Sequence, residues 1–526
     1  MKYLKLIIIG LLFLSSCSKD HYLTHIKEID TKLFIDSKGN IFFSLKDNSK
    51  YQIATWQNQS ISITLQSGHD LFNPFCYKNE ICALYDNNGD ENWRTTHSEL
   101  NAQLQNRYLE RIESDKTGNL IVFQPKNTNV LFLLDAETGD VQKIADIKAQ
   151  YHNTFFDHDN HRIFISLDDK IIVCDLTTRK AKPILAGVLG EKRNIFLSGV
   201  DLYFNSNDTS EYHQIYKYSL NGENVRPILV HKGTSDVMMP KLINGALYFI
   251  QCVQNHYQLR RRVGNSDDVI TKTGVVYQYC SCTDNRILFS YSDFNLPKSL
   301  MQYHIRENKI ENLTGEFCQL NIRLEYQPMH DALSPAYKII PDGNKKGTVL
   351  LFHPGLNGDF SPRWDTILMN LAQKGYEIVC PNYPMSFGYG KQYNNAQFED
   401  AINDMTAWKD HLLKESYNRP LFLLSSSSGN LLMEAVLYFN DKGIDGAISL
   451  FGLYNSRVPP ANIPQLVVLG ENDPKVNMAE RTGFILKSAN RNIKVVSLEN
   501  EGHWVRNNQN NSQILDVLLS FFTGHF

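Results

Sequence analysis

The sequence predicts a chain of two units: an all-β unit over residues 30–320, followed over residues 321–526 by an α/β unit whose sheet is mostly parallel and doubly wound. Three observations lead to this prediction. Short apolar runs alternate with polar turns up to residue 320, a motif returns there at a nearly constant interval, and from Ala336 continuous apolar strands alternate with helical patterns. At 526 residues the chain is also longer than one ordinary domain.

Composition and charge narrow the class of protein. Hydrophobic residues make up 42% and charged residues 21%, which is typical of a globular protein and excludes a wholly disordered chain. Lysine and arginine number 53 against 56 acidic residues, a net charge of -3, so electrostatics do not favour nucleic acid as a partner. Aromatic residues reach 11%, which favours a large β component.

The first residues resemble an export signal. Residues 1–16 combine two early lysines with an apolar run too short for a comfortable permanent membrane span. The run ends in LSSC at 14–17, which resembles the bacterial lipobox. The resemblance implies cleavage before Cys17, its lipidation, and a linker over residues 17–29. We therefore expect a protein of the bacterial cell envelope, attached to a membrane only through this lipid, on a periplasmic or outer-surface face. The alternative is an ordinary secretory signal in which Cys17 is incidental.

A repeat marks the first unit. Each copy reads as an apolar strand, a polar turn and a returning strand, as in LFLLDAETGDVQKI at 131–144. Successive copies end 40, 44, 42 and 43 residues apart, at Ile144, Ile184, Ile228, Ile270 and Leu313. A second hairpin motif lies out of phase with the first, and its copies begin at Asp36, Asp115, Asp157 and Cys282. Two hairpins per repeat make a four-stranded blade, so we predict a β-propeller of about seven blades. The alternative is an irregular stack of sheets.

The cysteines bear on two possibilities, disulfide bonds and a structural metal site. Nine are present, Cys17 and eight others. Export permits disulfides, and Cys76 with Cys82 lie close enough in sequence to close a hairpin, but spacing alone leaves the pairing open. Because paired CxxC elements are missing from the sequence, we expect no structural metal site.

The second unit changes its period. Its candidate strands are the continuous apolar runs at 348–353, 376–381, 421–424, 446–451, 465–469 and 493–498. Between the second and third runs, QFEDAINDMTAWKDHLLKE at 397–415 places its apolar side chains on one helical face. Strands of a buried type that alternate with helices predict a parallel sheet covered on both faces.

One of four consecutive serines is a candidate nucleophile. PLFLLSSSSGNLLMEAVLYF reads as a strand, a tight turn of small residues and a helix. Such a turn, a nucleophile elbow, needs small residues two before and two after the nucleophile. Only Ser427 meets this test, with Ser425 before it and Gly429 after it. The alternative is a polar, serine-rich loop without chemistry.

Candidates for a base and its orienting acid follow in the chain. Asp473 stands in LVVLGENDPKV and His503 in LENEGHW, each on a loop directly after an apolar strand. The order Ser427, Asp473, His503 is the order found in α/β hydrolases. A short carboxylate at this place can orient an imidazole, which in turn takes the proton of a serine hydroxyl.

The second half resembles the catalytic domain of the prolyl oligopeptidase family of serine peptidases. The segments with this resemblance are LLFHPG at 350–355, PNYPMSFGYGKQY at 381–393, SSSSGN, LGENDPKV and EGH. It extends over about the last 190 residues. The family places a propeller before its hydrolase domain, so both halves of the chain point to the same architecture.

The resemblance implies a role for each candidate residue. Ser427 would attack a carbonyl, His503 would take and return the proton, and Asp473 would orient His503. No cofactor is implied, because these three residues supply their own nucleophile and base.

The resemblance also implies an oxyanion site. Its expected donors are the backbone N–H of Ser428 and a donor from the loop 354–356, at Gly355 or Leu356. We expect His353, which precedes this loop, to pack or to form hydrogen bonds there rather than to do chemistry.

The sequence departs from the family pattern at three places. Pro384 and Met385 replace the family's Arg-Gly, which removes a cation near the active face, and Ser425 stands where glycine is usual. Ser427 and Asp473 are 46 residues apart, fewer than is usual in the family, so the segment between them is trimmed. Because that segment forms part of the family's substrate pocket, the family's specificity is not carried over.

These observations predict a serine peptidase of the cell envelope that hydrolyses short peptides through an acyl-enzyme. A propeller over the active face would admit peptides or small acyl substrates and exclude folded proteins. Two alternatives remain: a carboxylesterase or other acyl hydrolase with the same triad, and an inactive, propeller-based binding lipoprotein. In related enzymes, acidic residues of the propeller hold the N-terminus of a peptide. Glu91, Glu110 and Glu113 are available charges here, with no signal that selects them. The oligomeric state stays open.

Overall fold

The computed structural model describes residues 28–524 except 48–49, 58–59, 148–149, 189, 222–225, 284, 331–332, 416–418, 456–460 and 477–491. The predicted export signal and the lipidation site at Cys17 lie outside the described residues. Among the described residues, no helix is long and apolar enough to cross a membrane.

The strands of the first half pair mainly with their neighbours in sequence. The first sheet holds β1 (Glu28–Ile35), β2 (Ile41–Asp47), β3 (Lys50–Gln57) and β4 (Ser60–Leu65). A smaller sheet holds β5 (Phe72–Tyr77), β6 (Glu80–Tyr85) and β7 (Arg94–Thr95), followed by the short helix α2 (Ser98–Gln103). The third sheet holds β8 (Leu109–Ser114), β9 (Leu120–Pro125), β10 (Val130–Asp135) and β11 (Val141–Asp146).

The next two sheets have the same four-stranded plan. One holds β12 (Tyr151–Asp157), β13 (Arg162–Leu167), β14 (Ile171–Asp175) and β15 (Lys180–Ile184). The other holds β16 (Arg193–Ser198), β17 (Asp201–Ser206), β18 (Gln214–Ser219) and β19 (Ile228–His231).

The last sheet of the first half is twice as large. Its first four strands are β20 (Val237–Ile243), β21 (Ala246–Val253), β22 (His256–Val263) and β23 (Ser266–Val269). Its other four are β24 (Val275–Thr283), β25 (Arg286–Asp293), β26 (Leu296–His304) and β27 (Lys309–Asn312). One parallel bridge, between Tyr257 and Val275, joins the two groups. Because this bridge merges them into one sheet, the number of blades stays a prediction.

The predicted repeats are hairpins of these sheets. The copy at 131–144 forms β10 and β11, and the other copies form β14–β15, β18 with the start of β19, β22–β23 and β26–β27. The second motif contains the turns of β1–β2, β8–β9, β12–β13 and β24–β25. Cys76 and Cys82 are both free thiols. Cys82 is paired in register with Phe75, not with Cys76, so the two cysteines point to opposite faces of the hairpin.

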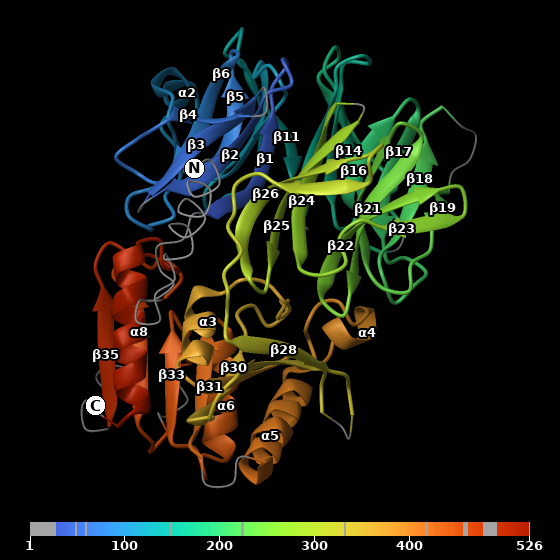
Figure 1. Cartoon of the computed structure of the whole chain (residues 1–526). Coiled ribbons are helices and arrows are strands. Elements are labelled where there is room, and N and C mark those ends of the chain that lie inside the picture. Colours follow the sequence, from blue (N-terminus) through green and yellow to red (C-terminus); the bar gives the residue numbers. More distant parts are fainter. Residues whose placement is uncertain are drawn as a thin grey trace, which may run out of the picture.

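Each sheet packs against the next through buried apolar side chains. Ile163 and Ile165 of β13 contact the sheet before theirs, whereas Phe164 contacts the sheet after it. Successive side chains of a strand point to opposite faces, so one apolar strand serves two interfaces. The first sheet also packs against the last, since Leu33 of β1 shares a core with Leu288 of β25. The sheets therefore close into a ring, which is how a propeller protects its edges (Figure 1).

The second half contains one eight-stranded sheet with the order β28-β29-β31-β30-β32-β33-β34-β35. Its strands are β28 (Ile322–Gln327), β29 (Ala336–Pro341), β30 (Gly347–Phe352), β31 (Tyr376–Pro381), β32 (Leu421–Ser426), β33 (Gly446–Leu450), β34 (Gln465–Gly470) and β35 (Ile493–Leu498). β28 and β29 are antiparallel, and β30 to β35 run parallel. The sequence runs at 376–381 and 493–498 match β31 and β35 to the residue, and the other four runs differ at their ends by one or two residues.

Helices cover both faces of this sheet. Within the described residues the helices of this half are α3 (Thr366–Gln373), α4 (Lys391–Asn394), α5 (Phe398–Glu415), α6 (Gly429–Phe439) and α8 (Asn508–Phe522), and all but the short α4 pack on the sheet. Val349 and Leu351 of β30 share a core with α3 and α8, whereas Leu350 and Phe352 share one with α5 and α6. The alternation of strand side chains explains why the central strands carry apolar residues on both faces, as the sequence indicated.

Candidate active site

The serine turn has the geometry of a nucleophile elbow. Ser427 follows β32 with φ 50°, a left-handed conformation that costs most residues energy, and α6 begins two residues later. A Cβ at Gly429 would lie 2.6 Å from the carbonyl oxygen of His353, so this position requires glycine. Ser425, in place of the usual glycine, is buried with its hydroxyl 3.0 Å from Asn430 Oδ1 and 3.2 Å from the carbonyl oxygen of Ile448. The substitution is thus accommodated by hydrogen bonds.

The three predicted side chains meet at the carboxyl edge of the sheet. Ser427 Oγ lies 2.7 Å from His503 Nε2, and His503 Nδ1 lies 2.8 Å from Asp473 Oδ2. Asp473 accepts a hydrogen bond from His503 Nδ1–H, which leaves the Nε2 lone pair free to accept a hydrogen bond from the serine hydroxyl. The side chains of His503 and Asp473 are 8% and 0% exposed, so water competes little for these bonds.

The predicted oxyanion donors lie beside this serine. The N–H of Gly355 donates to Ser428 Oγ at 3.0 Å and is therefore already engaged. Within the described part of the chain, the backbone N–H groups of Ser428 and Leu356 have no hydrogen-bond partner. Of the three donors named from the sequence, these two are available to a developing negative charge.

The signature at 381–393 holds the oxyanion loop in place. Asn382 accepts a hydrogen bond from the N–H of Phe360 at 2.6 Å and donates to its carbonyl at 3.0 Å. Tyr383 stacks on His353 with ring centroids 4.2 Å apart. Burial lowers the pKa of His353 to about 4, so this imidazole stays neutral at pH 7. Met385, where the family has glycine, has φ 94°, a conformation that glycine adopts more easily.

Two contacts that sequence reasoning missed attach the propeller to the loops of the site. Arg506 forms a buried, two-pronged ion pair with Asp86, at 2.5 and 2.9 Å. The Nδ2 of Asn472, the neighbour of Asp473, donates to the carbonyl of Asn88 at 3.0 Å. Residues 86–92 of the propeller therefore support the loops that carry both His503 and Asp473. No local sequence signal marks these contacts, because their partners lie more than 380 residues apart.

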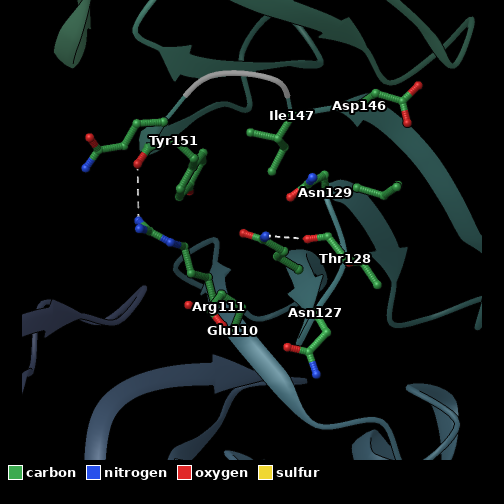
Figure 2. Close-up of a pocket in the computed structure, with 11 residues that line it drawn as sticks. Glu110, Arg111, Asn127, Thr128, Asn129, Asp146, Ile147 and Tyr151 are labelled. Carbon is green, nitrogen blue, oxygen red and sulfur yellow. Dashed lines mark hydrogen bonds between the residues drawn. The ribbon is translucent and has the colours of Figure 1, made fainter. Parts of the chain in front are cut away.

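The three glutamates considered as anchors for a peptide N-terminus have different surroundings. Glu91 lies 3.4 Å from Lys475, and Glu113 accepts the N–H of Thr154 at 2.9 Å. Glu110 lines a polar cavity of about 1090 Å³ in the propeller, beside Arg111 (Figure 2). The structure does not bring these carboxylates together into one site.

A second cavity adjoins the candidate site. It has a volume of about 340 Å³ and is lined by His503, Ser426 and Pro354 as well as by residues of α3 and of the first propeller sheet. It therefore lies between the two halves of the chain.

Comparison with known proteins supports the architecture. No sequence-family model matches the chain. A puromycin-hydrolysing peptidase of Mycobacterium tuberculosis superimposes with a TM-score of 0.78 at 14% identity, over 97% of this chain and 96% of that one. A prolyl endopeptidase gives 0.80 at 10% identity, over 95% and 90% of the two chains. Oligopeptidase B from Leishmania major gives 0.76 at 10% identity, over 96% and 87%. This chain therefore has the fold of the prolyl oligopeptidase family of serine peptidases, a propeller-type β unit followed by an α/β-hydrolase unit.

Proposed function

We propose that this protein is a serine peptidase that hydrolyses short peptides through an acyl-enzyme. The observation that carries the proposal is the continuous hydrogen-bond chain from Ser427 Oγ through His503 to Asp473, at 2.7 and 2.8 Å. Ser427 stands directly after β32 on a strained elbow, which is the arrangement of an activated serine. The fold likeness to known peptidases supports the same reading.

In the proposed reaction, Ser427 Oγ bonds to the carbonyl carbon of the scissile peptide as its proton passes to His503 Nε2. The N–H groups of Ser428 and Leu356 would hold the oxyanion that forms. When the C–N bond breaks, His503 gives its proton to the leaving amine. Water then attacks the acyl-serine, with His503 taking one proton, and Ser427 is released with its own proton restored. Asp473 keeps the imidazole in the required tautomer throughout.

The propeller would limit access to this site. It covers the carboxyl edge of the sheet, where the candidate residues lie (Figure 1). Short, flexible peptides are therefore the proposed substrates. We also propose a seven-bladed propeller, a doubly wound hydrolase sheet, and anchoring to the bacterial envelope through lipidated Cys17. Loss of palmitate labelling in Cys17→Ser, with labelling of the parent in the same bacterial host, tests the anchor.

A fluorophosphonate probe tests the activated serine. The protein without residues 1–17 is labelled beside Ser427→Ala and His503→Ala. Ser67→Ala and His411→Ala, which change the same residue types away from the site, serve as matched controls. We expect labelling of the parent and both controls, and none of the two site variants. A folded parent that stays unlabelled would overturn the proposal and would favour a binding protein.

A carboxylesterase would label in the same way. The two activities are separated by comparing kcat/KM for a peptide amide and for an ester with the same acyl group. Turnover of esters without turnover of any peptide in a library would replace the peptidase proposal by the esterase.

A further inference from the structure

The cavity of about 340 Å³ beside His503 contains both acidic and basic side chains. Its acidic residues already have donors. Asp359 accepts Asn255 Nδ2 at 2.9 Å and the hydroxyl of Ser361. Asp365 caps α3 by accepting the N–H of Leu368 at 3.0 Å. These carboxylates therefore have their hydrogen bonds within the protein.

Two further charges of the cavity come from the first propeller sheet. Glu28 accepts the hydroxyl of Tyr51 at 2.9 Å, and Lys46 Nζ lies 4.0 Å from Glu28 Oε1. Thus the lysine that reaches the cavity also has an acidic neighbour.

Arg363 is different from these groups. It is half-buried and lines the cavity. Among the described residues, its guanidinium has no hydrogen bond and no carboxylate within 4.0 Å; only its backbone N–H is engaged, by the carbonyl of Ser361 at 2.8 Å. A guanidinium keeps its charge at every physiological pH and presents five donors in a planar fork. A carboxylate is the group that this fork matches with two parallel hydrogen bonds.

The place of the cavity indicates which part of a substrate would reach it. In the proposed reaction the leaving amine receives its proton from His503, so the leaving fragment must lie on the His503 side of Ser427. His503 borders this cavity. The volume is at the small end of the range for ligand pockets, about 300–1,000 Å³, which suits a short fragment. The leaving fragment of a short peptide ends in a carboxylate.

We propose that Arg363 binds a carboxylate on the leaving side of the substrate, namely the C-terminal carboxylate of a peptide that ends close after the scissile bond. This inference rests on the proposed function and names its substrate class: short peptides with a free C-terminus. An acidic side chain on the leaving fragment offers the same chemistry and is a separate arm of the test. Arg363 is thus a specificity-determining residue.

Binding tests the inference without catalysis. Ser427→Ala protein is titrated by calorimetry with tetra-alanine, with its C-terminal amide, and with Ala-Ala-Ala-Asp amide. A charge-assisted, two-pronged contact predicts binding of the free acid about tenfold or more tighter than the amide. Adding Arg363→Met should reduce this ratio to about one, and Arg363→Lys should keep part of it. Arg323→Met, which removes an exposed arginine of β28, is the matched control and should leave the ratio unchanged.

Each outcome has a defined meaning. Equal binding of acid and amide, or no binding of the acid, overturns the inference, as does an equal loss for both peptides in Arg363→Met. Tighter binding of the aspartyl amide than of the free acid would place a side chain, not the C-terminus, at Arg363 and would also overturn it. Turnover and fluorophosphonate labelling of the parent are measured separately, so a failure of the peptidase proposal is distinguishable from a failure at Arg363.

Discussion

Replacing either partner of the ion pair between Arg506 and Asp86 should destabilise the protein far more than a surface ion pair would. The side chains are 5% and 1% exposed, and their two contacts measure 2.5 and 2.9 Å. Removal of one partner of a buried pair leaves the other charge without solvation, at a cost of about 3–5 kcal/mol.

The two single variants should differ. Without Arg506, Asp86 still accepts the N–H groups of Gly89 at 3.3 Å and Glu91 at 3.0 Å, so we place Arg506→Met near the lower limit, about 3 kcal/mol. Without Asp86, the guanidinium has no hydrogen-bond partner among the described residues, but it keeps its aromatic neighbours, among them Trp504 at 4.8 Å, and the longer-range attraction of Asp70 and Glu501. Asp86→Ala should therefore cost more than Arg506→Met, about 4–5 kcal/mol. The double variant should lose well under the sum, because neither charge is then stranded.

Urea unfolding followed by tryptophan fluorescence measures these free energies, since Trp93 and Trp504 border the pair. The control is Arg179→Met, which breaks a 2.9 Å pair whose partners are 52% and 55% exposed and should cost about 1 kcal/mol or less. Glu501 accepts the backbone N–H of Arg506 at 2.9 Å, so a disturbance at position 506 reaches the loop that carries His503. Arg506→Met should therefore also slow fluorophosphonate labelling. Losses below 1 kcal/mol for both single variants, or strictly additive losses in the double variant, would refute this reasoning.

Three further predictions follow from backbone strain, a buried carboxyl and a close contact between the two halves. Ser427→Gly should be about 1 kcal/mol more stable than Ser427→Ala in the same urea assay, because φ 50° strains any residue with a Cβ; equal stabilities would contradict the strain. Burial raises the pKa of Asp404 from 3.8 to about 6, so the folded state binds its proton more tightly and stability falls as pH rises through that window, by about 3 kcal/mol. Asp404→Asn should lose this component of the stability difference between pH 4 and pH 7, and an unchanged pH profile would refute it. Gly89→Ala should weaken both stability and labelling, because its Cβ would lie 2.6 Å from the Cα of Gly502, whereas Gly39→Ala, at a similar φ but in open space, should carry only the strain; equal losses would exclude the close contact as the cause.

Local pattern was enough for much of the fold. The hairpin repeats, the apolar strands and the helix at 397–415 were readable because each depends on the period of side chains along a few residues. Ser427 was selected from four serines by the size of its neighbours, and its φ of 50° is the strain that makes small neighbours necessary. Other properties of the chain could not be read in this way. The strands alone do not set the number of blades, because β22 and β24 join across the expected boundary.

What the sequence by itself determined is therefore the order of strands, turns and candidate side chains. Only the tertiary structure decided which distant groups meet: that the first sheet packs on the last, that Asp86 pairs with Arg506, and that Gly355 already donates to Ser428. It also left the guanidinium of Arg363 without a carboxylate within 4.0 Å among the described residues, although Asp359 and Asp365 are near enough to attract it electrostatically. The reason is physical. Periodicity is set by the backbone over a few residues, whereas a contact between residues hundreds apart depends on how complete sheets and loops pack.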